Sequence, residues 1–158
     1  MKPETPPPKR SLSPKLSAGV LALLITMVGS FEGLRQIAYN DPVGIPTICF
    51  GYTHGVKLGD KKSKEECSAL LAEELEVANA SVNRCLGPVS DNERAAYTSL
   101  VYNAGPKAVC GSTIQKRFKQ GDRAGACNAI TMWVYSKGIK LPGLVKRREA
   151  EKNLCLAQ

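Results

Sequence analysis

The chain has 158 residues, 43% hydrophobic and 23% charged, without an internal repeat or sustained heptad pattern, which favours one globular domain and excludes a solenoid or coiled coil. Its 22 basic and 14 acidic residues give a net charge of +8, which favours a polyanionic partner such as nucleic acid, an anionic membrane surface or bacterial cell wall, or serves only solubility. The basic residues are scattered and no recognition helix or base-stacking motif accompanies them, so we expect no nucleic-acid partner.

The chain begins with a polar tail and an apolar run. Residues 1–15 contain five prolines and five charges and have almost nothing to bury, so we predict a disordered basic tail. Residues 16–31 carry no charge. As a helix they would reach about 24 Å, short of the roughly 30 Å hydrocarbon core of a bilayer. Because small residues such as Gly19, Ala22 and Gly29 dilute its hydrophobicity, the run could enter a membrane without being held there strongly.

Turn residues and capping signals divide the remainder into a small sheet followed by helices. Residues 39–52 are interrupted by Asp41-Pro42 and by glycines, which indicates short strands with tight turns. Ser63 and Glu66 form a capping box that opens a helix reaching about Arg84. This order predicts an α+β fold, with a small β lobe on a larger all-helical lobe. Further helices are expected at 91–102, 112–119, 122–134 and 143–155.

Six cysteines occur, at positions 49, 67, 85, 110, 127 and 155. No CxxC is present and His54 is the single histidine, so no zinc site of usual spacing is available, and we expect neither a metal nor another cofactor. This many cysteines indicates three disulfides and an oxidising compartment rather than reduced thiols in a cytosolic protein. Spacing alone leaves their pairing open.

Two carboxylates near the end of the apolar run lie in contrasting surroundings. Glu32 follows the run directly, among apolar neighbours where desolvation favours a protonated carboxyl. Asp41 begins a turn before Pro42, a more open and polar place. Glycoside cleavage requires one protonated and one ionised carboxyl, although most Glu/Asp pairs at such a spacing are solvated surface charges.

Residues 31–53, FEGLRQIAYNDPVGIPTICFGYT, resemble the active-site region of the phage-type lysozymes, glycoside hydrolase family 24. In that family a Glu is followed after eight residues by Asp or Cys and after five more by Thr, and here these positions are Glu32, Asp41 and Thr47. The resemblance covers about residues 20–156. Three later segments are similar to family motifs in the same order: SLVYNAG (99–105), CGSTIQKRFKQGDRAGAC (110–127) and LPGLVKRREAEKNLCL (141–156).

The resemblance implies hydrolysis of the β-1,4 bond between N-acetylmuramic acid and N-acetylglucosamine of peptidoglycan, in a cleft between the lobes. By position, Glu32 would be the general acid. Asp41 would hold or activate the attacking water, and Thr47 would help to place that water. If Asp41 handles a water rather than attacking the sugar, the product should have inverted stereochemistry.

The resemblance also suggests secondary site residues. Tyr102 and Ser112 match positions that touch sugar, although ordinary packing would explain both. Either Arg147 or Arg148 would pair with Glu32 and orient it, or both lie on a solvated basic helix face.

One segment departs from the family pattern. The family often reads Gly-Tyr-Gly-His-Thr after the catalytic Thr, whereas this chain reads CFGYTHGV, so Tyr52 stands where His is common. We therefore expect His54 to be a structural or surface residue.

The apolar run permits three interpretations. We favour a signal-anchor-release segment, similar to that of lambdoid phage endolysins, which tethers the enzyme to the inner membrane of the host before release into the periplasm. The alternatives are a buried first helix in a cytoplasmic endolysin released by a holin, and a cleaved signal peptide. In the folded state we expect residues 16–31 to pack into the large lobe, where leucine at Gly19, Ala22 and Gly29 would overpack the site.

Two other function classes remain for comparison: a lytic transglycosylase, and a non-enzymatic cationic protein that disrupts walls or membranes. Asp41 and Thr47 argue against the first, because a transglycosylase needs no attacking water. We expect a monomer. For the disulfides we predict pairing in chain order, which keeps each loop short: Cys49 with Cys67, Cys85 with Cys110, and Cys127 with Cys155.

Overall fold

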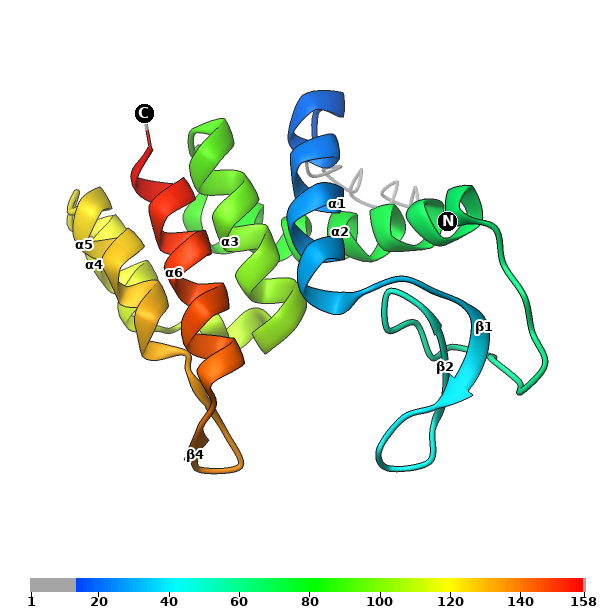
Figure 1. Cartoon of the computed structure of the whole chain (residues 1–158). Helices are drawn as coiled ribbons and strands as arrows, with labels where there is room; N and C mark the ends of the chain where they lie inside the picture. The colour runs from blue at the N-terminus through cyan, green and yellow to red at the C-terminus, as the bar shows by residue number, and fades with distance from the viewer. Residues whose placement is uncertain (1–13, 158) are drawn as a thin grey trace, which may run out of the picture.

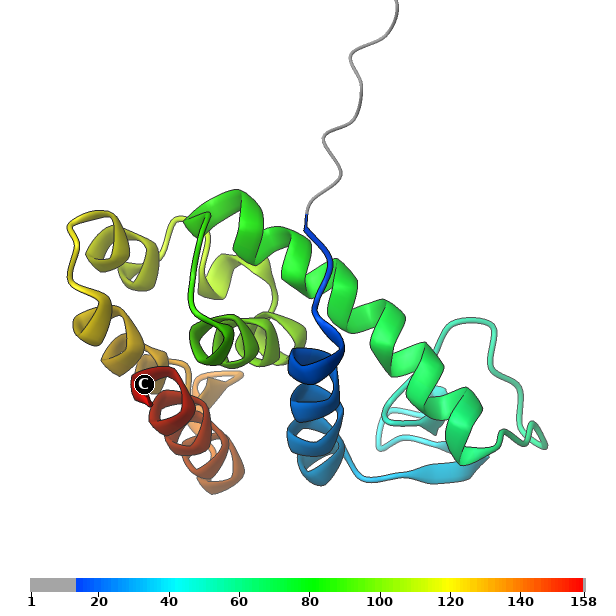
Figure 2. The ribbon, with the colours of Figure 1, turned by 90° about the horizontal axis from the view of Figure 1, so that it is seen from above.

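The structure is a computed structural model that describes residues 14–157, so residues 1–13 of the predicted tail, and residue 158, lie outside it. A small β lobe and a larger helical lobe are joined by the long helix α2, Lys64–Leu86 (Figures 1 and 2), which confirms the predicted α+β architecture. The last two residues assigned to the tail, Pro14 and Lys15, are described, and the Pro14 carbonyl is hydrogen-bonded to α2 rather than free.

The predicted small sheet and helices occur in the predicted order, with further short elements between the later helices. The elements are α1 Ala18–Glu32, β1 Arg35–Asn40, β2 Pro46–Cys49, α2 Lys64–Leu86, α3 Asp91–Ala104, η1 Pro106–Ala108, α4 Thr113–Lys119, α5 Arg123–Asn128, η2 Ala129–Met132, β3 Tyr135–Ser136, β4 Ile139–Lys140 and α6 Pro142–Leu156.

The β lobe is built on the antiparallel pair β1 and β2. Tyr39 lies opposite Thr47, and the register is irregular between Arg35 and Tyr39. Strand β1 begins at Arg35, before the predicted residue 39. Gly33, with φ 73°, ends α1, and the chain becomes extended directly after it.

Helices α2 and α3 both begin with capping boxes. The box of Ser63 and Glu66 that was predicted for α2 is present, and an equivalent box of Ser90 and Glu93 opens α3. Each box satisfies two backbone N–H groups that would otherwise lack partners, so the starts of both helices are set locally by sequence.

The helix predicted at 122–134 is wrong in its second half. The α-helix ends at Asn128 and continues as the 3-10 turn η2. The Thr131 hydroxyl donates to the Asn128 carbonyl at 2.8 Å, and the β-branched residues Ile130 and Thr131 have low helix propensity.

The loop expected after this helix contains a hairpin. Strands β3 and β4 pair antiparallel across Lys137 and Gly138, which both have positive φ. Two consecutive residues with positive φ form the tight turn that matches the twist of short antiparallel strands. The Lys137-Gly138 pair therefore closes a hairpin that was not predicted from the sequence.

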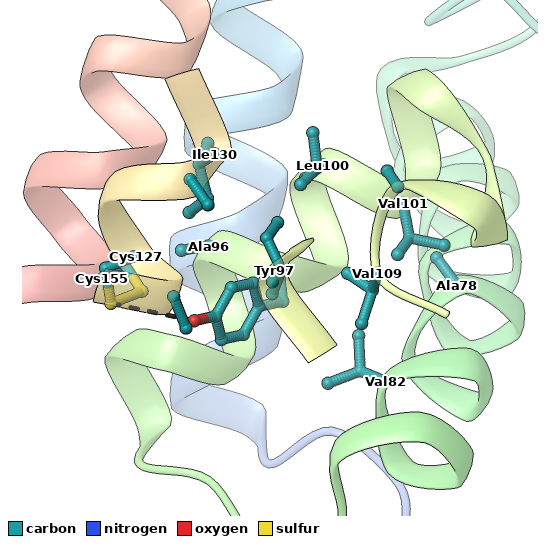
Figure 3. Close-up of a cluster of buried hydrophobic side chains, with 14 residues drawn as sticks. Ala78, Val82, Ala96, Tyr97, Leu100, Val101, Val109, Cys127, Ile130 and Cys155 are labelled. Carbon is teal, nitrogen blue, oxygen red and sulfur yellow. Dashed lines mark hydrogen bonds between the residues drawn. A yellow bond between two sulfur atoms is a disulfide. The ribbon is translucent and has the colours of Figure 1, made fainter. Parts of the chain in front are cut away.

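Two clusters of buried side chains stabilise the fold. The larger one joins α2 to α6 in the helical lobe around Tyr97, Leu100 and Ile130 (Figure 3). These three side chains have no exposed surface, so truncating any one to alanine would cost about 2–5 kcal/mol.

The apolar run is buried on one face against the helical lobe, as predicted. Val20, Leu24 and Val28 are buried as α1 packs against α2 and α3, and they belong to the second cluster, which also contains Ile48 and Phe50 of the β lobe. α1 therefore packs on the helical lobe at its junction with the small lobe. Within residues 14–157, no helix has the length and apolar character needed to cross a membrane.

The three predicted disulfides are present. Cys49 is bonded to Cys67, Cys85 to Cys110 and Cys127 to Cys155, and no cysteine of the described chain is free. The first bond joins β2 to α2, and the third joins α5 to the last helix.

Candidate active site

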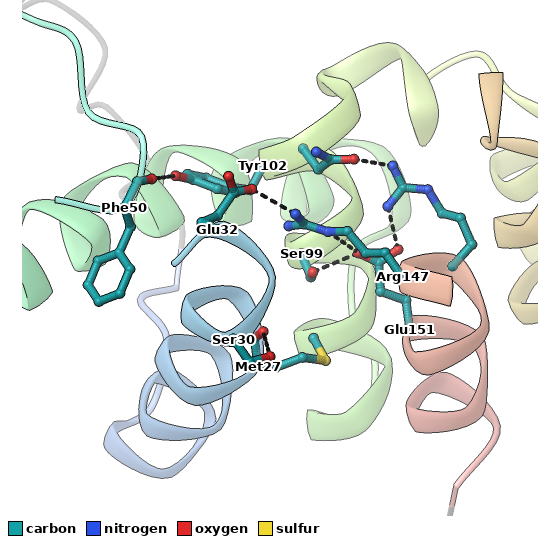
Figure 4. Close-up of polar contacts among 10 residues, drawn as sticks. Met27, Ser30, Glu32, Phe50, Ser99, Tyr102, Arg147 and Glu151 are labelled. Carbon is teal, nitrogen blue, oxygen red and sulfur yellow. Dashed lines mark hydrogen bonds and ion pairs between the residues drawn. The ribbon is translucent and has the colours of Figure 1, made fainter. Parts of the chain in front are cut away.

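The carboxylate of Glu32 is ion-paired, rather than surrounded by the apolar side chains that we expected. Arg147 Nη1 on α6 donates to Glu32 Oε1 at 2.7 Å (Figure 4), which resolves the choice between the two arginines. The Arg147 side chain is 5% exposed and that of Glu32 is 26% exposed. The guanidinium also lies 5.0 Å from the centre of the Phe31 ring. A buried cation thus holds a carboxylate that stays open to solvent.

A second, fully buried carboxylate holds Arg147 from the other side. Glu151 Oε1 accepts hydrogen bonds from Arg147 Nε at 3.3 Å and from the Ser99 hydroxyl at 2.7 Å. Glu151 Oε2 accepts from Arg148 Nη1 at 2.8 Å. Because Glu151 has no exposed surface, its charge requires these partners, and together they fix the direction of Arg147.

Arg148 does not contact Glu32 and instead forms hydrogen bonds within the helical lobe. Its Nε donates to the Trp133 carbonyl at 2.7 Å, and its Nη2 donates to Asn103 Oδ1. Burial lowers the pKa of Arg148, and the charge of Glu151 offsets part of that effect. The chain of contacts from Glu32 through Arg147 and Glu151 to α3 is visible in Figure 4.

The loop after β2 forms the opposite wall of the site. Gly51 has φ 86°, and a Cβ there would stand 3.7 Å from Glu32 Oε2. The Tyr102 hydroxyl of α3 donates to the Phe50 carbonyl at 3.1 Å and ties this loop to the helical lobe (Figure 4). Glu32 therefore lies where α1, α6 and the β lobe meet.

Asp41 begins the turn that joins β1 to β2, and Thr47 is the second residue of β2. Asp41 Oδ1 accepts from the backbone N–H groups of Val43 at 2.9 Å and Ile45 at 2.8 Å. The Thr47 side chain is buried, and its hydroxyl donates to the Ile45 carbonyl at 2.9 Å. The turn thus holds one oxygen of Asp41 and directs the Thr47 hydroxyl, so both side chains have defined orientations.

Comparison with known proteins assigns the family. The sequence pattern of the phage lysozyme family matches residues 29–151. A protein named SAR-endolysin from Enterobacteria phage P21 is 32% identical over 94% of each chain, and another from Pseudomonas phage phiKMV is 37% identical over 89% of this chain and 91% of its own. The chain belongs to the phage lysozyme family. It is a lysozyme of the endolysin type, an enzyme that hydrolyses peptidoglycan to lyse cells.

Solved structures agree with the lysozyme fold. The active form of the P1 phage endolysin Lyz matches with a TM-score of 0.77 and 27% identity, over 90% of this chain and 96% of that one. The secreted inactive form of the same endolysin matches with a TM-score of only 0.58, at 23% identity over the same shares. The arrangement of elements in this lysozyme is therefore closer to the active form.

The lysozyme places Tyr102 and Ser112, the two residues predicted to touch sugar, in separate cavities. Tyr102 lines a cavity of about 430 Å³ together with His54 and Glu74. Ser112 lines one of about 370 Å³ beside Trp133, and its hydroxyl donates to the Val109 carbonyl at 2.7 Å. Contact with sugar remains a prediction for both.

The cavity beside Tyr102 carries a carboxyl with an altered proton affinity. Burial raises the pKa of Glu74, while the Tyr102 hydroxyl and His54 act in the opposite direction and Glu32 adds to the increase. Burial likewise raises the pKa of Tyr102. His54 is exposed, as predicted, with its ring 5.3 Å from that of Tyr52.

Sequence reasoning missed Ser99 and Glu151. The signal for Glu151 is the spacing R-R-x-x-E on α6, since residues three and four apart lie side by side on a helix. Ser99 had no signal, because it lies 52 residues from the carboxylate that it contacts.

In the part of the chain that the structure describes, no group of three or more His, Cys, Asp or Glu side chains could hold a metal ion.

Proposed function

We propose that this lysozyme cleaves the β-1,4 bond between N-acetylmuramic acid and N-acetylglucosamine, with Glu32 as general acid. The contact that supports this role most strongly is the 2.7 Å ion pair between Arg147 Nη1 and Glu32 Oε1. It anchors one carboxyl oxygen, whereas Oε2 lies beside Gly51, where no side chain covers it. A general acid needs this combination of fixed position and access to the leaving oxygen.

Asp41 is proposed as the second carboxylate, which holds the attacking water with help from Thr47. Because two backbone N–H groups bind Asp41 Oδ1, the other oxygen is left for a water. The Thr47 hydroxyl donates its hydrogen bond to the Ile45 carbonyl, so its lone pairs can accept a hydrogen bond from the same water. Attack by a water predicts inversion of the anomeric configuration, and proton NMR of the released product detects which anomer forms first. Retention of configuration would favour direct attack by Asp41.

Replacing the acid tests the proposal. Glu32→Gln is nearly isosteric and raises the net charge by one, so the fold should persist while the rate on purified murein falls at least about 100-fold. Glu73→Gln on α2 makes the same chemical change at an exposed position and should leave the rate unchanged. Near-normal clearing by Glu32→Gln would remove Glu32 from the mechanism.

The same measurements separate the alternatives. A cationic wall-disrupting protein would retain its effect in Glu32→Gln, since that change makes the chain slightly more positive. A lytic transglycosylase would release anhydro products, whereas hydrolysis adds a water to each cut, so the mass of the released muropeptides decides between them.

We further propose that residues 16–31 are an uncleaved signal-anchor-release segment, so that the lysozyme is first tethered to the inner membrane and then acts in the host periplasm. The relatives from phages P21 and phiKMV carry the name SAR-endolysin. The outward face of α1 is compatible with both water and lipid: the Thr26 hydroxyl donates to the Ala22 carbonyl at 3.0 Å and the Ser30 hydroxyl to the Met27 carbonyl at 2.6 Å. Hydroxyls that are satisfied within their own helix cost less in a bilayer.

Cell fractionation with N-terminal sequencing tests the location. An uncleaved chain found first in the membrane and later in the periplasm supports anchor release. A chain found only in the cytoplasm supports a holin-dependent endolysin. A chain shortened near residue 30 indicates a signal peptide, although that cut would remove the buried Val20, Leu24 and Val28 from the folded protein.

A further inference from the structure

The buried face of α1 is apolar, so hydrophobic burial alone fixes its position along its own axis less sharply than directional hydrogen bonds do. Val20, Leu24 and Val28 supply the buried face, and apolar burial has no directional preference. A slip by one residue would move Glu32 by about 1.5 Å and rotate it by about 100°. Among the described residues, hydrogen bonds from residues 14–32 to the rest of the molecule occur only at the two ends of this segment.

The N-terminal end of this segment is held by three side chains of α2. The Pro14 carbonyl accepts hydrogen bonds from Asn79 Nδ2 and Asn83 Nδ2, both at 2.9 Å. The Leu16 backbone N–H donates to Glu76 Oε1 at 3.1 Å. The C-terminal end is held by the contact of Glu32 with Arg147.

The two asparagines are oriented by an arginine on α3. Arg94 Nη1 donates to Asn79 Oδ1 at 2.8 Å and also to Asn83 Oδ1, which leaves the amide N–H groups of both free to point at Pro14. Asn79 has no exposed surface, and a buried amide is costly unless its groups are hydrogen-bonded. We call Glu76, Asn79, Asn83 and Arg94 the N-terminal clasp.

We propose that Asn79 and Asn83, oriented by Arg94, are positioning residues for the catalytic acid. By binding the Pro14 carbonyl they set the register of α1, and the helix of about 22 Å then carries Glu32 to Arg147. They act through α1 and touch no substrate. The inference rests on the proposed role of Glu32.

The clasp consists only of residues that follow the apolar run in the sequence. It recognises backbone groups, a carbonyl and an N–H, so it places no demand on the side chains of residues 14–16. A segment arriving from a bilayer would therefore be stopped at one position by polar contacts at both ends, while its apolar face remains adaptable.

The combined variant Asn79→Ala, Asn83→Ala in the full chain tests this inference. We expect kcat on purified peptidoglycan to fall about tenfold with KM changed less than about twofold, because the substrate surface is untouched while the acid is misplaced. Amide hydrogens of α1 should exchange faster, whereas those of α3 and α6 should not. Asn92→Ala is the matched control, since Asn92 Nδ2 also donates to a backbone carbonyl, that of Ala157, at 3.1 Å.

Arg94→Ala provides a second test that leaves both asparagines in place. It removes the donor that orients their amides, and kcat should fall as in the double variant, with no further loss when both changes are combined. If the double variant does not fold, Asn83→Ala alone and Arg94→Ala decide. Wild-type kcat in folded clasp variants, or an equal loss in Asn92→Ala, would overturn the inference. A fully active Glu32→Gln would instead reject the proposed acid, independently of the clasp.

Discussion

Arg147 Nη1 lies 2.7 Å from Glu32 Oε1, and this contact spans 115 residues of sequence. It joins the end of an apolar first helix to the buried ionic cluster of the last helix. Without α1, the Arg147 guanidinium would face an empty site with one carboxylate to offset two arginines. The candidate active site is therefore complete only when α1 is docked.

We predict that Arg147→Lys lowers kcat about tenfold. The arginine contacts Glu32 through Nη1 and Glu151 through Nε, whereas a lysine ammonium is a single compact charge that cannot span both carboxylates. Steady-state kinetics on murein measures the loss. Arg84→Lys changes an exposed arginine on α2 in the same way and should leave kcat unchanged. Equal kcat values for Arg147→Lys and Arg84→Lys would contradict the need for a guanidinium that contacts both carboxylates.

Glu151→Gln should lower the free energy of unfolding by about 3–5 kcal/mol, because it removes the buried carboxylate that offsets Arg147 and Arg148. Urea unfolding measures this loss. Adding Arg148→Met to Glu151→Gln removes the second buried cation and should recover part of the stability. If the double variant is less stable than Glu151→Gln, hydrogen bonding by Arg148 to Asn103 and Trp133 outweighs the charge balance.

Removing the disulfide between Cys127 and Cys155 as a serine pair should destabilise the fold by about 3 kcal/mol, since that bond closes a 28-residue loop in the unfolded chain. Thermal unfolding with and without reductant measures the effect for all three bonds together. A melting temperature that does not change on reduction would contradict a structural role for them.

If residues 16–31 act as the proposed anchor, leucine at both Gly19 and Ala22 should lengthen the time in the membrane without harming the folded enzyme. We expected such changes to overpack the folded site, but Ala22 is exposed and a Cβ on Gly19 would meet no atom within 4 Å. Gly29 differs, because a Cβ there would stand 3.2 Å from the Phe50 ring. Gly29→Leu should therefore reduce the activity of purified enzyme, whereas Gly19→Leu with Ala22→Leu should delay only lysis of cells. Lysis on the normal schedule by the latter would argue against anchor release.

Glu74→Gln should stabilise the protein at neutral pH. Burial raises the pKa of Glu74 in the folded state above its ordinary value of 4.5, so the folded state favours the protonated carboxyl, and that favourable contribution is lost as pH rises through the folded pKa. The variant should therefore melt at a higher temperature than wild type at pH 7, with the difference vanishing below about pH 4. Glu73→Gln, its exposed neighbour, should show no such dependence. A lower melting temperature for Glu74→Gln at pH 7 would mean that its contacts with Tyr102 and His54 outweigh burial.

The sequence by itself determined what depends on neighbours along the chain. The capping boxes that begin α2 and α3 are local hydrogen-bonding patterns, and the one at Ser63 was predicted from the sequence. The order of a small sheet before a helical lobe follows from turn residues and apolar periodicity. Pairing of the cysteines in chain order also succeeded, because short loops are the least costly to close.

Only the tertiary structure decided which of two adjacent arginines meets Glu32. Arg147 and Arg148 are chemically identical and differ by about 100° around α6, so the packing of that helix, not its composition, turns one toward α1 and the other toward Asn103. Packing likewise placed the apolar face of α1 where the two lobes meet and brought Pro14 to Asn79. These contacts join residues that are distant in sequence, and their energies depend on where whole helices come to rest, which no local pattern encodes.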